Sequence, residues 1–149
     1  MNRYQTKVQI TNKSTNQLPE YKSDGAAGLD IPAFLSSPIT LEKNVPTLVP
    51  TGLHIALPKG LEGQIRARSG TARKGTIILN APGTIDSDYR GEIKVLMMNL
   101  LDQPFVIKNG DRIAQLVVTS YTSITWEPTK KLPETVRGEG GFGSTGVGD

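Results

Sequence analysis

The residues best suited to chemistry lie at positions 80–92, which read Asn-Ala-Pro-Gly-Thr-Ile-Asp-Ser-Asp-Tyr-Arg-Gly-Glu. Turn-forming residues open this segment, and apolar β-formers at residues 76–79 and 93–98 flank it. The pattern predicts a β-hairpin. Such a hairpin can hold a flat ring of a ligand against Tyr89, with the carboxylate of Asp86 beside the group attached to that ring.

A second polar group, Arg68, Ser69 and Gly70, lies where a predicted strand enters a glycine-punctuated turn. Arginine offers a planar fork of donors, serine offers a hydroxyl, and glycine lets backbone N–H groups approach a ligand closely. This combination suits phosphate oxygens. A basic solvated turn has the same composition, so the cluster alone leaves both interpretations open.

The glycine-rich end of the chain holds a third group: Arg137, Phe142, Gly143, Ser144 and Thr145. Its spacing superficially resembles a P-loop, but the required lysine is missing and only four residues follow Thr145, so a P-loop is excluded. What remains is an arm rich in N–H and hydroxyl donors, which could order over an anionic ligand and close a site. A disordered tail is the alternative.

Asp30 in one place, and Gln115 with Arg112 in another, are the remaining polar candidates. Asp30 follows Gly28 and Leu29, where it could approach a metal ion or a phosphate-binding residue, or simply cap a turn. Gln115 and Arg112 lie where a turn leads into a strand. Gln115 could hold a water or a phosphate oxygen, and a solvent-facing position is the alternative.

Composition excludes several classes of protein. There is no cysteine, hence no disulfide framework and no thiolate nucleophile, and the single histidine, His54, excludes a multi-histidine metal site. A net charge of +3 fits small anionic ligands. It is too small to indicate nucleic-acid binding, so we expect no nucleic-acid partner. No apolar run approaches 18 residues and the N-terminus lacks a signal-peptide pattern, so we expect no membrane association and a cytoplasmic location.

The elements that must position these residues are predicted to be strands. The chain has 16 glycines and 10 prolines spread along it, and no amphipathic helical stripe of ten or more residues is evident. One short helix is predicted near residues 69–74, within an all-β sandwich or barrel. The predicted strands cover residues 7–11, 28–31, 47–49, 52–57, 62–67, 76–79, 93–98, 105–107 and 113–118.

Taken in order, the polar clusters resemble the five motifs of the homotrimeric dUTPase family, over residues 20–146. The resemblance implies an all-β, jelly-roll-like body at residues 1–133 and a flexible glycine-rich arm at residues 134–149. It also implies a homotrimer with three shared active sites and Mg²⁺-dependent hydrolysis of dUTP to dUMP and pyrophosphate. That reaction would limit uracil in DNA and supply dUMP for dTMP synthesis.

The resemblance also assigns roles to residues. Asp86 looks like the residue that orients the attacking water, and Tyr89 like the platform under the sugar that excludes a 2′-hydroxyl. Asp30 would support the Mg²⁺ side of the site through water. The uracil edge would be read by Asn80 and the segment Gly83, Thr84 and Ile85. The phosphates would be held by Arg68, Ser69, Gly70 and Gln115. The lid would consist of Arg137, Phe142, Gly143, Ser144 and Thr145.

Two positions depart from the family pattern: Ala67, where proline is common, and Thr71, where leucine is common. Two alternatives remain. A dCTP deaminase resembles dUTPases in fold and in parts of these motifs, but Asp88 and Tyr89 and the complete C-terminal arm favour a dUTPase. A nucleotide-gated regulatory binding protein is the alternative from another class, and the chain has no long insertion to serve such a role.

Overall fold

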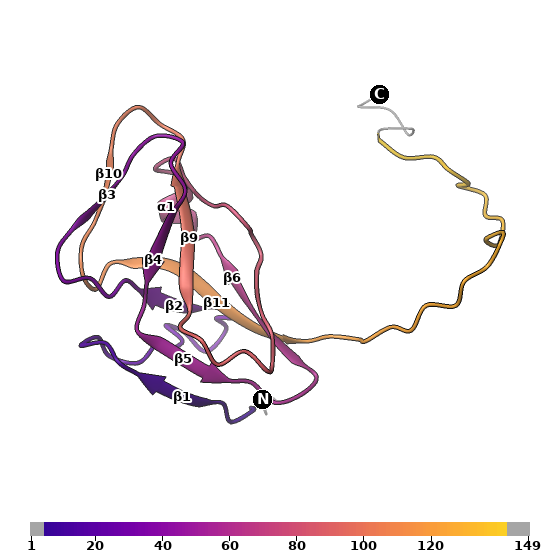
Figure 1. Cartoon of the computed structure of the whole chain (residues 1–149), viewed down its shortest axis with the longest axis horizontal. Coiled ribbons are helices and arrows are strands. Elements are labelled where there is room, and N and C mark those ends of the chain that lie inside the picture. The colour runs from indigo at the N-terminus through magenta and orange to yellow at the C-terminus, as the bar shows by residue number, and fades with distance from the viewer. Residues whose placement is uncertain (1–4, 143–149) are drawn as a thin grey trace.

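Strands make up nearly all the regular structure of this chain. A computed structural model describes residues 5–142 (Figure 1). One short helix, α1 (Ser69–Ala72), interrupts the strands. The strands are β1 (Gln9–Asn12), β2 (Leu29–Pro32), β3 (Ile39–Leu41), β4 (Thr47–Pro50), β5 (Leu53–Ala56), β6 (Leu61–Arg66), β7 (Thr76–Ile78), β8 (Gly83–Ile85), β9 (Lys94–Asn99), β10 (Phe105–Ile107) and β11 (Arg112–Ser120).

Two sheets position the residues of interest. One has four strands in the order β2-β11-β6-β8, and the other has three in the order β4-β9-β7. Two-stranded pairs, β1-β5 and β3-β10, complete the body. Every pair of strands is antiparallel. Strands distant in the sequence are therefore neighbours in space, which is what brings separate motifs together.

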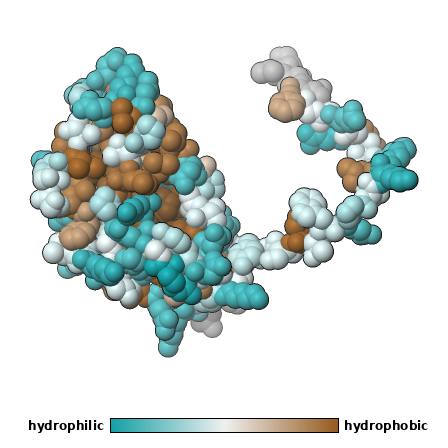
Figure 2. Space-filling model, in the orientation of Figure 1, coloured by the Kyte–Doolittle hydropathy of each residue, from teal (hydrophilic) through white to brown (hydrophobic). Residues whose placement is uncertain are grey.

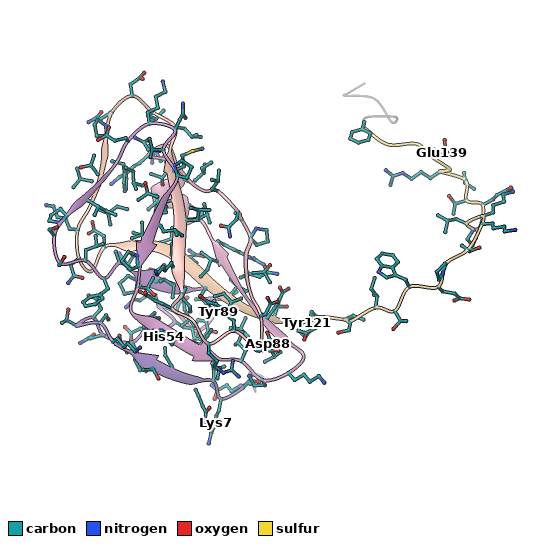
Figure 3. The ribbon with its side chains drawn as sticks, viewed as in Figure 1. Lys7, His54, Asp88, Tyr89, Tyr121 and Glu139 are labelled. Atoms are coloured by element: carbon teal, nitrogen blue, oxygen red, sulfur yellow. The ribbon has the colours of Figure 1, made fainter. Side chains whose placement is uncertain are left out.

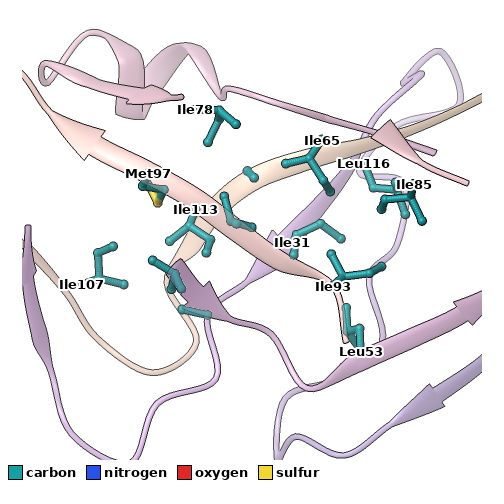
Figure 4. Close-up of a cluster of buried hydrophobic side chains, with 14 of the residues drawn as sticks. Ile31, Leu53, Ile65, Ile78, Ile85, Ile93, Met97, Ile107, Ile113 and Leu116 are labelled. Atoms are coloured by element: carbon teal, nitrogen blue, oxygen red, sulfur yellow. The ribbon is translucent and has the colours of Figure 1, made fainter. Parts of the chain in front are cut away.

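The core lies between these sheets because the strands alternate inward and outward side chains. On β9, Val95 and Met97 are fully buried, whereas Lys94 points outward. Ile31 and Leu116 reach the same cluster from the four-stranded sheet (Figure 4). Short strands with one buried face are thus sufficient to build a continuous apolar core.

The prediction of an all-β fold is confirmed, and each of the nine predicted strands overlaps an observed one. The predicted helix near residues 69–74 corresponds to α1. Two short strands, β3 and β8, were not predicted. Each has only three residues, which is too short for a clear alternation of apolar and polar side chains.

The prediction that residues 80–92 form a simple hairpin needs correction. The flanking strands do pair, with Ile77 opposite Met98, as β7 and β9 of one sheet. The connection between them, however, crosses to the other sheet, where β8 pairs with β6. The physical reason is that Gly83 and Ile85 are buried and Thr84 is exposed, so β8 behaves as an edge strand with its own core face. We call residues 80–92 the crossover loop.

Beyond β11 the chain leaves the body. Residues 121–142 form no strand or helix and extend away from the sheets (Figure 1). Large apolar side chains are exposed along them, including Trp126 and Leu132. The predicted division at residues 133 and 134 stays a prediction. In the part of the chain that the structure describes, no helix has the length and apolar character needed to cross a membrane.

Candidate active site

Asp30 holds two arginines together at one end of the four-stranded sheet. Its Oδ1 accepts a hydrogen bond from Nε of Arg68 at 2.9 Å, and its Oδ2 accepts one from Nη1 of Arg112 at 3.1 Å. Nη2 of Arg68 lies 3.4 Å from the same Oδ2, and its Nη1 donates to the backbone oxygen of Arg112 at 2.9 Å. The carboxylate thus orients both cations while partly offsetting their charge.

Strand register explains why these residues meet. On β11, Gln115 lies opposite Asp30 of β2 on one side and opposite Arg66 of β6 on the other. The amide of Gln115 lies over Gly28, where an added Cβ would be 2.8 Å from its Oε1. Gly28 therefore leaves the space that the side chain of Gln115 occupies. The candidate residues Asp30, Arg68 and Gln115 are therefore brought together within one chain.

Ser69 and Gly70 open helix α1, directly after Arg68, whose backbone is still extended. The first N–H groups of a helix have no acceptor within the helix, so they are available to a ligand. No atom lies within 4 Å of a Cβ built on Gly70, so this turn is open. Thr71 is buried and its hydroxyl donates to the backbone oxygen of Arg68 at 2.9 Å. A threonine at this unusual position is therefore accommodated by a hydrogen bond.

The crossover loop forms a separate pocket of about 280 Å³. Its lining includes Asn80, Gly83, Thr84, Ile85 and Tyr89, which are the residues predicted to surround the base and the sugar. The pairing of β8 with β6 fixes the backbone of this wall. The pocket therefore offers backbone polar groups beside one exposed aromatic ring, which suits a flat heterocycle attached to a sugar.

Within one chain, Asp86 and the cluster of Asp30, Arg68 and Arg112 are separated along β6. Strand β8 runs antiparallel to β6, with Gly63 opposite Ile85. Asp86 is therefore level with Glu62 at the start of β6, whereas Arg68 follows the end of that strand. The six residue steps from Glu62 to Arg68 span roughly 20 Å of extended chain. A single chain therefore does not bring Asp86 to its own Arg68.

The C-terminal candidates lie away from both groups. Arg137 donates from Nε to the backbone oxygen of Gly140 at 2.8 Å, and Phe142 is exposed. Figure 3 shows the neighbouring Glu139 well away from the body, on which Tyr89 and His54 lie. The remaining predicted lid residues fall outside the described residues: Gly143, Ser144 and Thr145.

The dUTPase family model matches residues 14–146, nearly the whole chain. The chain belongs to the dUTPase family. Its membership agrees with the resemblance drawn from the five motifs.

Curated relatives of this dUTPase-family chain match over almost its full length. A deoxyuridine 5′-triphosphate nucleotidohydrolase of Rickettsia akari is 51% identical over 148 residues, covering 99% of this chain and 100% of the relative. The protein of the same name from Rickettsia bellii strain OSU 85-389 is also 51% identical, over 144 residues and 96% of each chain.

Solved dUTPases share the fold at lower identity. A mutant dUTPase of Staphylococcus bacteriophage 80alpha, solved with dUpNHpp, superposes with a TM-score of 0.84 at 24% identity, covering 96% of this chain and 100% of the other. A mutant dUTPase from phage phi11 of S. aureus, described as coordinating a structural Mg(II) ion, gives 0.77 at 20% identity, over 87% and 100% of the two chains. These likenesses confirm the predicted jelly-roll-like fold.

Sequence reasoning did not place Arg112 or Glu92 among the site residues of this dUTPase-family chain. Arg112 shares the carboxylate of Asp30 with Arg68. Glu92 fastens the crossover loop to the turn between β4 and β5. Arg112 was visible as a charged residue beside Gln115, but its partner lies 82 positions away and no local pattern reveals that pairing.

Proposed function

We propose that this protein hydrolyses dUTP to dUMP and pyrophosphate in a Mg²⁺-dependent reaction. The match to the dUTPase family over residues 14–146 carries this proposal. The two groups of residues in the site agree with it, since one suits phosphates and the other suits a base and sugar. In a cell this activity would limit uracil in DNA and supply dUMP for dTMP synthesis.

The products locate the cleavage at the anhydride linkage between the α- and β-phosphorus atoms, and we propose attack at the α-phosphorus. The oxygen of a water attacks the α-phosphorus of dUTP, and the bond from that phosphorus to the bridging oxygen of pyrophosphate breaks. Asp86 orients this water and accepts its proton. A positioned general base contributes roughly 10²–10⁴-fold to such a reaction. The absence of cysteine does not hinder this chemistry, because no covalent intermediate is needed.

The phosphates bind at the arginine cluster. Three of the five N–H donors that a guanidinium carries are used within the chain at Arg68, and two remain for phosphate oxygens. Backbone N–H groups at Ser69 and Gly70 and the amide of Gln115 add further donors. Because Asp30 holds Arg68 in place before the ligand arrives, little side-chain freedom is lost on binding.

The crossover loop binds the nucleoside. Backbone groups from Gly83 to Ile85 and the amide of Asn80 read the uracil edge, and a tight wall leaves no room for the methyl group of thymine. The ring of Tyr89 lies under the sugar and excludes a 2′-hydroxyl. A wrong base or sugar leaves buried polar groups unpaired or creates a clash, which is how such sites discriminate.

Mg²⁺ fits this site as a partner of the phosphates. In residues 5–142 no three or more carboxylate or imidazole groups gather as a metal cage. Mg²⁺ commonly binds phosphate oxygens and waters, with only one or two protein carboxylates. Both oxygens of Asp30 already accept from arginines, so its contact with the ion would pass through water. When bound, the ion neutralises phosphate charge.

The active sites are shared in a homotrimer. Asp86 and Arg68 at opposite ends of β6 support this, because a second copy must bring one of them to the other. An apolar outer face on the three-stranded sheet also supports it, formed by Leu48 opposite Leu96 and Ile77 opposite Met98. Figure 2 shows a broad hydrophobic area on the body. The extended arm would carry Arg137 and Phe142 to a site of another copy as a lid, with Gly143, Ser144 and Thr145.

The deciding experiment measures pyrophosphate release from dUTP, dTTP, dCTP and UTP, with Mg²⁺ and with excess EDTA. We expect release from dUTP to exceed the other three greatly and to stop in EDTA. Ammonia release from dCTP would instead identify a deaminase. Binding of dUTP without release would favour the regulatory alternative.

A further inference from the structure

The position of the Tyr89 ring depends on the residue two places later. Gly91 has no room for a side chain because the ring folds back over its backbone. A Cβ built on Gly91 would lie 2.7 Å from Cε2 of Tyr89 and closer still to its Cζ and hydroxyl oxygen. The φ angle of Gly91 is not in the left-handed region, so this position requires space rather than an unusual conformation.

The ring is also tied at its far end. The hydroxyl of Tyr89 donates to the backbone oxygen of Glu92 at 3.0 Å. The backbone N–H of Tyr89 donates to the oxygen of Asp86 at 3.1 Å, which closes a turn. The hydroxyl is therefore engaged within the protein, and Tyr89 lines the pocket of the crossover loop.

Glu92 anchors the end of the crossover loop to the body. Its Oε1 accepts from the backbone N–H of Thr51 at 3.1 Å and of Gly52 at 2.9 Å. The hydroxyl of the fully buried Thr51 donates to the backbone oxygen of Ile93 at 2.6 Å. Glu92 therefore makes two kinds of contact. Its backbone oxygen accepts from the Tyr89 hydroxyl, and its side chain binds the turn between β4 and β5.

A second set of contacts fixes the middle of the same loop. Nδ1 of His54 on β5 forms a hydrogen bond with the backbone oxygen of Arg90 at 3.1 Å. Nη1 of Arg90 donates to the backbone oxygens of Ser87 at 2.8 Å and Tyr89 at 2.9 Å. Because each contact holds backbone rather than a flexible side chain, the loop has a defined shape before any ligand is bound.

We propose that Gly91 and Glu92 are positioning residues that determine the choice between deoxyribose and ribose, by fixing the Tyr89 ring in place. This inference rests on the proposed function, in which that ring lies under the sugar. A ring that lies against Gly91 and is bonded through its hydroxyl to Glu92 cannot retreat from a 2′-hydroxyl. A ring displaced by a methyl group at position 91, or released by a loosened Glu92, can move away and admit the ribonucleotide.

The test compares kcat/KM for dUTP and for UTP in the full-length wild type and in G91A, E92A and E92Q. We expect the dUTP/UTP ratio to fall about fivefold or more in G91A and E92A, the size of effect that one lost hydrogen bond produces. E92Q keeps a carbonyl oxygen that can accept from both N–H groups, so the ratio should stay near that of the wild type. G25A is the matched control, since no atom lies within 4 Å of a Cβ built there.

The outcomes separate this inference from the function on which it rests. If the wild type releases no pyrophosphate from dUTP, the proposed function fails and this inference fails with it. If the wild type is active but folded G91A and E92A keep the wild-type ratio, only this inference is wrong. Circular dichroism reports folding. If neither variant folds, Y89F is the deciding variant, because it removes only the hydrogen bond from the Tyr89 hydroxyl to Glu92. A lower dUTP/UTP ratio in Y89F would support the inference, and an unchanged ratio would contradict it.

Discussion

Asp30 and Arg68 form a two-point ion pair, with Nε 2.9 Å from Oδ1 and Nη2 3.4 Å from Oδ2. Their side chains are 14% and 23% exposed, so water screens the pair only partly. Arg112 lies on the same carboxylate. Asp30 therefore bridges two cations that would otherwise repel each other.

Replacing this carboxylate should weaken both stability and binding. In D30N the two guanidinium groups lose their shared counter-charge, so we expect the free energy of unfolding to fall by roughly 1–3 kcal/mol and the KM for dUTP to rise. Urea unfolding and steady-state kinetics measure these changes. D102N is the matched control, because the ion pair of Asp102 with Lys43 is largely exposed and should contribute less than about 1 kcal/mol. Equal stability losses in both variants would contradict this view of Asp30.

Gly28 and Gln115 should act as a unit. An added Cβ at Gly28 would meet Oε1 of Gln115 at 2.8 Å, and a flexible amide can turn away at little cost to the fold. We therefore expect G28A to raise the KM for dUTP with a loss of stability below about 1 kcal/mol. In the Q115A background, G28A should add no further increase. A fully additive effect in this double-mutant cycle would mean that Gly28 acts through another contact.

Asp86 is exposed and directly follows β8. Its carboxylate is the proposed general base. We expect D86N to bind dUTP almost as the wild type does but to lose about 10²–10⁴-fold in kcat. Isothermal titration with a non-hydrolysable dUTP analogue measures the binding. The neighbouring variant D88N serves as the control and should keep most of its turnover. Near-normal kcat in D86N would remove Asp86 from the role of base.

Sites shared between copies should allow inactive variants to rescue each other. R68A and D86N are each expected to be inactive alone. In co-expressed mixed trimers, roughly a quarter of the sites receive an intact Arg68 from one copy and an intact Asp86 from another, so a similar fraction of activity should return. Absence of rescue in verified mixed trimers would mean that each chain completes its own site.

The sequence predicted the strands well and the relationships between them poorly. Alternation of apolar residues is local, so β9 and β11 could be recognised from their own residues. The crossing of β8 to the other sheet depends on its pairing with β6, about 20 positions earlier in the chain. The shared use of Asp30 by two arginines depends on two such pairings, which no local pattern contains. Candidate residues were therefore easier to name than the contacts that orient them.

The placement of Asp86 and Arg68 at opposite ends of β6 has a consequence for how much of the protein a cell must make. If the halves of a site arrive on different molecules, dilution below the dissociation constant of the assembly removes activity even though every chain remains folded. Specific activity then rises with abundance instead of being constant. Such an enzyme would have little activity at low concentration, and its total activity would rise more than proportionally when its synthesis is increased.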